Sequence, residues 1–171
     1  SYNTVQNEVL SSGGAPEFNV GGFQFLGSFI KEGQPLGYFR GNRPILDENN
    51  NITEVIPNAA LGSPIAPRFG SMSLNVNYKG LSLFATGDYQ HGGQTVAVDD
   101  VLRYFAGAST VIPENLVGGN FFDLAGLWVQ SSDYLKIRNI SLSYKIPSQF
   151  YGKAIQSMSI GFNALNPINF F

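Results

Sequence analysis

One segment constrains the fold of this chain more than any other. In residues 68–90, "RFGSMSLNVNYKGLSLFATGDYQ", apolar and polar residues alternate almost without interruption. Successive side chains of a β-strand point to opposite faces of the sheet, so this pattern predicts two strands with one apolar face. Lys79-Gly80 is a two-residue turn of the kind that joins antiparallel strands, because Gly readily adopts a positive φ.

A hairpin closed at Lys79-Gly80 makes both strands agree on which face is apolar. The apolar face then pairs Tyr78 with Leu81, Val76 with Leu83, Leu74 with Ala85, and Met72 with Gly87. The opposite face pairs Asn77 with Ser82, Asn75 with Phe84, Ser73 with Thr86, and Ser71 with Asp88. A register slip of one residue would destroy this agreement.

Such a hairpin suits either a half-exposed sheet of a soluble β-sandwich or the wall of a transmembrane β-barrel. Charged residues make up 13% of the chain, about half the ~25% of an ordinary soluble protein. Aromatic residues also make up 13%, with 14 Phe and 8 Tyr. This composition is typical of lipid-facing and lumen-facing residues that alternate along transmembrane strands.

Composition also limits which partners and which kinds of site the chain can have. The sequence contains no run of 18 apolar residues, and therefore no candidate transmembrane helix. A net charge of −2 argues against nucleic acid as a partner. The absence of Cys excludes disulfides and thiolate metal sites.

Four further strands are expected outside the hairpin. They cover residues 17–31 with a β-bulge at Gly21-Gly22, 35–42, 132–146 with a bulge near Arg138-Asn139, and about 155–165. Residues 1–16 are expected to form a loop. The helical spacing of Val98, Val101, Leu102 and Phe105 predicts a short surface helix around 96–106.

The lengths of the connections separate the two fold classes. Short links are expected at 32–34, 79–80 and 147–154, and long ones at 43–67 and 91–131. Short turns on one rim and long loops on the other are typical of outer-membrane barrels, in which the short turns are periplasmic. We therefore expect an all-β fold, an antiparallel section of about six strands from a larger transmembrane β-barrel, because fewer than eight strands do not close one.

Four stretches of the sequence resemble the SusC/RagA family of TonB-linked outer-membrane transporters, in the C-terminal part of their barrel. They are "KEGQPLGYFRG" (31–41), "LGSPIAPRFGSMSLNVNYKGLSLFATGDYQHGG" (61–93), "SDYLKIRNISLSYKIP" (132–147) and "FNALNPINFF" (162–171). The third is similar to the family's "YLRLKNVSLGYTLP" type of strand. Their order and spacing carry the resemblance over most of residues 31–171.

The resemblance implies a fold, a location and partners. Members form a 22-strand barrel with an N-terminal plug in the cell outer membrane, and they import oligosaccharides or peptides with energy from the TonB complex. Residues 1–171 would then be a C-terminal barrel part without the plug, and would not transport alone. The implied partners are outer-membrane lipid, the remainder of the barrel, a SusD-like lipoprotein over the extracellular mouth, and TonB through the missing plug.

No catalytic, cofactor or metal site is expected. Acidic residues and the one His do not cluster as acid–base chemistry requires, so we expect no enzyme. "DENNN" (47–51) begins like a calcium loop, but Ile52 and Asn58 stand where such a loop needs Gly and Glu, so a solvated turn is expected.

Six polar residues are the candidates for contact with a substrate or with the capping lipoprotein: Asp88, Gln90, His91, Asp99, Asp100 and Arg103. The alternative for Asp99, Asp100 and Arg103 is an ordinary polar helix face, with Asp near the positive N-terminal end of the helix. The alternative for His91 is an exposed loop residue.

Two faces of the wall are expected to meet different surroundings. Met72, Leu74, Val76, Leu81 and Leu83 would face lipid, with an aromatic girdle at the strand ends formed by Tyr78, Tyr89, Tyr134, Tyr144 and Trp128. The hydrated face would carry Asn75, Asn77, Ser82, Asp88, Gln90, Ser141 and Ser143. A soluble cell-surface β-sandwich that binds carbohydrate is the alternative, and it requires Met72 and Leu83 to be buried between two sheets. A simple outer-membrane pore that does not transport is a further variant.

Overall fold

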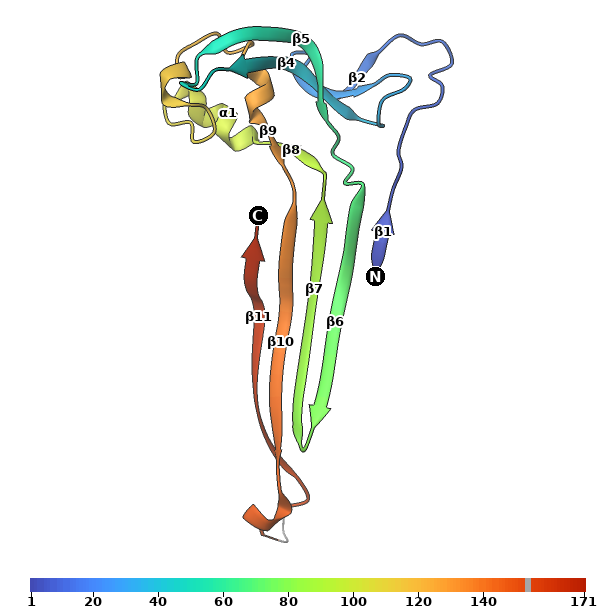
Figure 1. The fold of residues 1–171 in the computed structure, drawn as a ribbon, viewed down its shortest axis with the longest axis vertical. Coiled ribbons are helices and arrows are strands. Elements are labelled where there is room, and N and C mark those ends of the chain that lie inside the picture. Colours follow the sequence, from blue (N-terminus) through green and yellow to red (C-terminus); the bar gives the residue numbers. More distant parts are fainter. Residues whose placement is uncertain (153–154) are drawn as a thin grey trace. The chain divides into compact units, whose positions relative to one another are not determined.

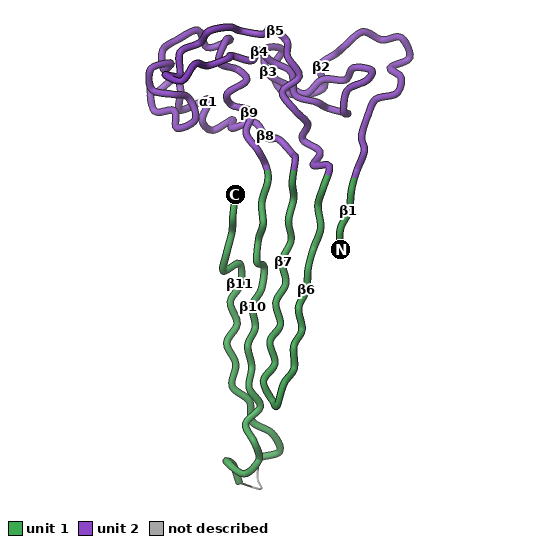
Figure 2. The backbone as a smooth tube through the Cα atoms, viewed as in Figure 1, with its two compact units in different colours: residues 1–4, 68–91, 133–171 green, residues 5–67, 92–132 purple. Residues whose placement is uncertain are grey.

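The computed structural model describes residues 1–152 and 155–171, and the chain forms two compact units (Figure 2). Unit 1 comprises Ser1–Thr4, Arg68–His91 and Asp133–Phe171, and unit 2 comprises Val5–Pro67 and Gly92–Ser132. Within these described ranges, no helix has the length and apolar character needed to cross a membrane. The fold is all-β with antiparallel sheets and one short α-helix, which confirms the predicted fold class.

Unit 1 is a five-stranded antiparallel sheet in the order β1-β6-β7-β10-β11 (Figure 1). Its strands are β1 (Tyr2–Thr4), β6 (Arg68–Tyr78), β7 (Leu81–His91), β10 (Tyr134–Ile146) and β11 (Met158–Phe170), with a short 3-10 helix, η3, at Ser148–Phe150. Four of these strands are 11 or 13 residues long, about twice the ~5–6 residues usual in soluble sheets.

The β6–β7 hairpin has the register that the alternation predicts. Tyr78 pairs with Leu81, and the ladder continues without a break to Arg68 opposite His91. Lys79 and Gly80 both have positive φ, 45° and 85°. Positive φ at both central residues is what a type I′ turn requires, and this turn matches the twist of the strands that it joins.

β10 contains the predicted bulge. Its pairing with β7 and with β11 shifts between Ile137 and Asn139, so Arg138 is the extra residue. The shift keeps the apolar residues of both halves of the strand on one face. β11 is longer than the expected 155–165, and the predicted link 147–154 includes residues 153–154, which lie outside the described residues.

The register joins the apolar residues of four strands into one continuous face. It consists of Met72, Leu74, Val76 and Tyr78 of β6, Leu81, Leu83 and Ala85 of β7, Ile140, Leu142, Tyr144 and Ile146 of β10, and Met158, Ile160, Phe162 and Ala164 of β11. No second layer covers this face among the described residues of unit 1: Met72 is 51% exposed and Ile160 67%. The burial of Met72 that a sandwich requires is therefore absent.

The structure places only three of the five aromatic residues expected in the girdle on the apolar face. Tyr78 and Tyr144 lie on the apolar face near the Lys79-Gly80 turn, and Tyr89 lies on the same face at the other end. Tyr134 pairs with Gln90 and therefore lies on the opposite, polar face. Trp128 belongs to unit 2 and is completely buried, so its assignment to the girdle is wrong.

Unit 2 contains a four-stranded sheet, a two-stranded sheet and short helices (Figure 1). These elements are β2 (Phe18–Gly22), β3 (Leu26–Ile30), β4 (Tyr38–Leu46), β5 (Ile52–Gly62), β8 (Gln94–Val96), α1 (Val98–Phe105), η1 (Glu114–Leu116), η2 (Ala125–Trp128) and β9 (Val129–Ser131). Leu26, Tyr104, Ile112, Leu124, Ala125 and Trp128 form its core. α1 confirms the helix predicted around 96–106.

Three predictions for the first half of the chain are wrong. The expected strand 17–31 is a hairpin, β2–β3, because Gly22 has a φ of 77° and the chain reverses at Phe23, whose N–H donates to the Leu26 carbonyl. The expected connection 43–67 contains β5, which pairs with β4. The loop 1–16 contains β1, which pairs with β6.

The β4–β5 pair explains why sequence periodicity misses β5. The ladder slips between Gly41 and Arg43, opposite Pro57 and Asn58, and Asn58 has a φ of 52°. The turn between these strands is the predicted solvated turn, in which Asp47 accepts hydrogen bonds from the N–H groups of Asn49 and Asn51. Strands 17–31 and 35–42 thus contribute to a sheet other than the one that contains β6 and β7.

As predicted, the short and the long connections of the unit 1 sheet lie at opposite ends of its strands. Thr4 pairs with Arg68, Arg68 with His91, and Gln90 with Tyr134, so the chain leaves for unit 2 and returns at a single end of this sheet. The tight Lys79-Gly80 turn lies at the opposite end. The two long excursions, 5–67 and 92–132, fold together as unit 2.

Replacement of Gly80 by Val is expected to lower the free energy of unfolding by about 1–2 kcal/mol, because a β-branched residue does not tolerate positive φ. The added Cβ would also lie 3.1 Å from the Lys145 carbonyl oxygen. Urea unfolding of the purified full-length protein measures the change. Lys79→Asn is the control and should retain stability, because Asn tolerates positive φ. Equal losses in both variants would contradict the turn assignment.

Candidate functional site

The polar face of the unit 1 sheet brings together the residues predicted to be hydrated. Strand alternation and register place Asn75, Asn77, Ser82, Asp88, Gln90, Ser141 and Ser143 on one face. Phe69, Phe84 and Leu165 interrupt it as apolar members. Most of this face therefore consists of small neutral hydrogen-bonding groups, with charges concentrated toward the end from which the excursions depart.

Asp88 is the centre of a charged group at that end of the sheet. Arg138, the extra residue of the β10 bulge, donates to both Asp88 oxygens through Nε and Nη2, the latter over 2.9 Å. The Tyr134 hydroxyl also hydrogen-bonds the Asp88 carboxylate. A two-point contact between guanidinium and carboxylate fixes the orientation of both groups. The candidate residues from the sequence include Asp88 but miss Arg138, although the predicted bulge signalled a residue outside the regular pairing.

His91 lies on the other face of the same sheet. Alternation places it with Tyr89, and its Nδ1 lies 2.6 Å from Oδ2 of Asp133, the residue that precedes β10. The pair joins the end of β7 to the start of β10. Asp88 and Gln90 therefore share a face, whereas His91 does not join them.

Asp99 and Arg103 lie one turn apart on α1 and form an exposed ion pair, with 3.3 Å between Arg103 Nη2 and Asp99 Oδ2. Exposed pairs of this kind stabilise a helix only slightly. This arrangement fits the polar helix face given as the alternative for these two residues. Contact between them and a substrate or protein partner stays a prediction.

Asp100 has a structural role, which corrects its inclusion among the contact residues. Its side chain is only 2% exposed and belongs to the interior of unit 2. The Thr110 N–H donates to Oδ1 over 2.6 Å, and the Ser109 hydroxyl and Trp128 Nε1 donate to Oδ2. A buried carboxylate with this many donors holds segment 109–110 and the buried indole against α1.

The electrostatics of Asp100 follow from these contacts. Burial by itself raises the pKa of the carboxyl, but the hydrogen bonds from Ser109, Thr110 and Trp128 outweigh it and lower the pKa to about 2. The group is therefore ionised at any physiological pH. Among the described residues, no three His, Asp or Glu side chains converge as a metal site.

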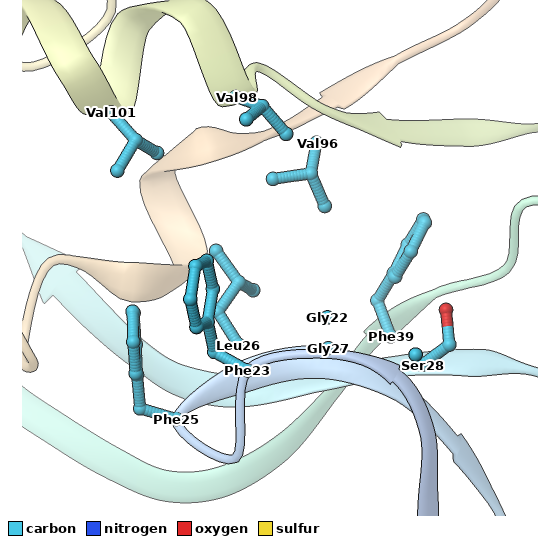
Figure 3. Close-up of a pocket in the computed structure, with 11 residues that line it drawn as sticks. Gly22, Phe23, Phe25, Leu26, Gly27, Ser28, Phe39, Val96, Val98 and Val101 are labelled. Atoms are coloured by element: carbon cyan, nitrogen blue, oxygen red, sulfur yellow. The ribbon is translucent and has the colours of Figure 1, made fainter.

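Unit 2 contains a hollow with a mostly apolar lining that sequence reasoning did not anticipate (Figure 3). Its volume is about 270 Å³, and β2, β3, the turn between them, β4, β8 and α1 contribute to its lining. Val96, Val98 and Val101 face Leu26 and Phe39 across the hollow (Figure 3). The remaining lining residues are Gly21, Gly22, Phe23, Phe25, Gly27 and Ser28.

Gly27 is required by the close packing beneath this pocket. A Cβ at this position would lie 2.5 Å from the carbonyl oxygens of Gly21 and Phe23. The Asn19 side chain donates to the same two carbonyls and braces the turn. The aromatic residues and glycines in 17–31 were the available signal. Their phase shift predicted a bulge, and the β2–β3 ladder does shift between Asn19 and Gly21, but the reversal of the chain into a hairpin was not predicted.

Comparison with known proteins finds solved structures with a similar fold. No family model matches the sequence, and no curated protein matches it. The structure is similar to chains of the RagAB peptide importer in the closed-closed state (TM-score 0.61, covering 92% of this chain) and in the open-open state (0.63, 96%), and of the RagAB peptide transporter (0.64, 93%).

Sequence identity to each of these chains is 17%, so the comparison shows a shared fold. The chain spans about a fifth of their length, 21–22%. The matched fold extends over nearly all of the present chain, including both of its units.

Asp100→Asn should lower the free energy of unfolding by roughly 2 kcal/mol at neutral pH, because the charge that strengthens the hydrogen bonds is lost. The pKa of Asp100 is about 2 in the folded protein against an ordinary 3.8. Its stabilisation is therefore present above pH ~4 and is lost as the pH falls toward 2.

Urea unfolding of the full-length protein between pH 2 and pH 7 measures this contribution. The Asn variant should lose the part of the pH dependence that Asp100 supplies. Asp99→Asn, a neighbour with an exposed side chain, is the control and should leave stability nearly unchanged. Identical pH profiles for the wild type and the Asp100 variant would contradict the assignment.

Proposed function

We propose that this chain is part of a TonB-dependent transporter of the outer membrane, which imports nutrients, oligosaccharides or peptides, into the periplasm. The unit 1 sheet would be a section of the barrel wall, and the excursions that form unit 2 would be extracellular. The remainder of the barrel, a SusD-like lipoprotein, and TonB acting through a plug are the partners of this assembly. The role of the chain is transport rather than catalysis.

The observation that carries this proposal is the uncovered apolar face that extends across β6, β7, β10 and β11. A soluble protein rarely exposes so large a continuous apolar surface, because its contact with water is unfavourable. Acyl chains would remove this cost, and the opposite face of Ser, Thr and Asn suits a hydrated lumen. Transmembrane strands need ~9–11 residues, which these four strands satisfy.

The open edges of the sheet support a larger barrel. Among the described residues, β11 pairs only with β10, and the part of β6 from Met72 to Tyr78 pairs only with β7. Unpaired backbone groups in hydrocarbon cost several kcal/mol each, so a wall in lipid requires neighbouring strands at both edges. The likeness to part of the RagAB chains is consistent with such an arrangement.

Site-directed labelling tests which face meets lipid. This chain contains no Cys, so Leu74→Cys and Phe162→Cys mark the apolar face, and the adjacent Asn75→Cys and Asn163→Cys mark the polar face. In outer-membrane vesicles containing the full-length protein, a charged maleimide should modify the two polar-face variants much faster. An environment-sensitive fluorophore should emit at shorter wavelength from the two apolar-face positions.

Each apolar-face variant has its polar-face control one residue away on the same strand. Equal reactivity of all four cysteines toward the charged reagent would contradict the proposal. Recovery of the full-length protein in the soluble fraction, with Leu74 and Phe162 protected by protein, would favour the carbohydrate-binding sandwich.

A further inference from the structure

Two Tyr-Lys dipeptides lie side by side at one end of the unit 1 sheet, the end that carries the tight turn between β6 and β7 and is called the turn end below (Figure 1). Tyr78 pairs with Leu81, and Leu81 pairs with Tyr144 on its other side, so these three side chains form one row across the apolar face. Lys79 and Lys145 each follow one of the two tyrosines. The Lys145 N–H donates over 2.8 Å to the carbonyl of the turn glycine, which places this lysine alongside the turn that contains the other.

The turn end carries positive charge without compensating carboxylates. Asp88 and Asp133 are the only acidic residues in the sequence of unit 1, and both lie toward the opposite end of the sheet. Lys79 and Lys145 are exposed, and no acidic side chain among the described residues forms an ion pair with either of them. A partner at this end therefore meets two free ammonium groups.

The ammonium group of Lys79 leans toward the apolar face. Its Nζ lies 5.2 Å from the centre of the Tyr78 ring, and Tyr78 belongs to that face. Lys145 follows Tyr144 in a strand, so its side chain projects from the opposite face. An ammonium group beside an aromatic ring, at the border of an apolar surface, suits the headgroup layer of a bilayer, where Tyr is enriched and Lys extends its charge toward water.

Charge determines which headgroup fits this position best. Every glycerophospholipid has a phosphate that attracts Lys, but in phosphatidylethanolamine the headgroup carries its own ammonium group, which neutralises the phosphate. In phosphatidylglycerol the negative charge of the phosphate is uncompensated. The attraction between one Lys near the surface and anionic lipid corresponds to a preference of roughly fivefold.

We propose that the turn end of the unit 1 sheet binds anionic glycerophospholipids, with Lys79 as the main contact of the headgroup and Lys145 as a second, weaker attraction. The inference rests on the membrane location proposed above and adds to it the class of lipid. Charge complementarity carries it, because cations end an apolar face that acyl chains would cover. An acidic segment of another protein would match the charge, but it would not supply acyl chains to the apolar face.

Quenching by brominated lipids measures which lipid lies beside the turn end. Val76→Cys, on the apolar face next to Tyr78 in the alternation, carries a bimane fluorophore in the full-length protein, with any other Cys replaced by Ser. The vesicles contain four parts of phosphatidylethanolamine to one part of phosphatidylglycerol. Either the phosphatidylglycerol or an equal amount of the phosphatidylethanolamine is brominated on its acyl chains. The surface charge is the same in both preparations, so the ratio of quenching reports local enrichment alone.

In the wild-type background, brominated phosphatidylglycerol should quench at least twofold more than brominated phosphatidylethanolamine. The excess should disappear in ~1 M salt, where the Debye length is only about 3 Å. Lys79→Asn, which preserves the turn, should remove most of the excess, and Lys145→Gln a smaller part. Lys136→Gln is the matched control on β10 and should leave the excess unchanged, because Lys136 lies opposite Asp88 and away from the turn. The salt response keeps the inference testable if a variant fails to fold.

Equal quenching by the two brominated lipids, or an excess that survives both high salt and the combined Lys79→Asn and Lys145→Gln change, would overturn the inference and leave the apolar face in lipid. Absence of quenching by either lipid would remove the membrane location and the inference together. A Lys79-dependent excess in a protein whose deletion leaves nutrient uptake by the cells unchanged would keep the lipid site and remove the transport role.

Discussion

The register of the β6–β7 hairpin is the constraint on which the unit 1 sheet depends. Because strand side chains alternate, a slip of one residue would exchange the apolar and polar faces of both strands. The turn at Lys79 and Gly80 prevents the slip, and the pairing of β7 with β10 extends the same choice of faces to β10. The bulge at Arg138 then corrects the phase of β10, so a face that begins in one hairpin extends over four strands.

The two units differ in how far their apolar side chains are buried. The unit 1 sheet leaves the side chains of its apolar face exposed among the described residues. Unit 2 buries Trp128 and Leu124 completely and organises its interior around the Asp100 carboxylate, which connects α1 to segment 109–110. One chain thus combines an open sheet with a packed unit.

Sequence reasoning succeeded where one strong local signal determined the outcome. The alternation in 68–90 predicted the register residue by residue, and the phase change near Arg138 predicted the bulge. It failed where tertiary packing determined the structure. Gly27 packs against its own turn, and 17–31 is therefore a hairpin. The irregularity at Pro57-Asn58 interrupts the alternation and conceals β5. Asp100 looked like a surface residue because its partners, Ser109, Thr110 and Trp128, are nine or more positions away in the chain.

Unit 2 is built from two excursions that are separated in the chain by the β6–β7 hairpin. Its core joins Leu26 of the first excursion to Tyr104, Leu124 and Trp128 of the second. Most buried members of this core belong to the second excursion, and Leu26 of the first packs among them, so a change at Leu26 is felt by residues of the second excursion. Exchange of the first excursion alone between related chains would therefore be tolerated only where the incoming segment supplies a side chain that fits the space of Leu26.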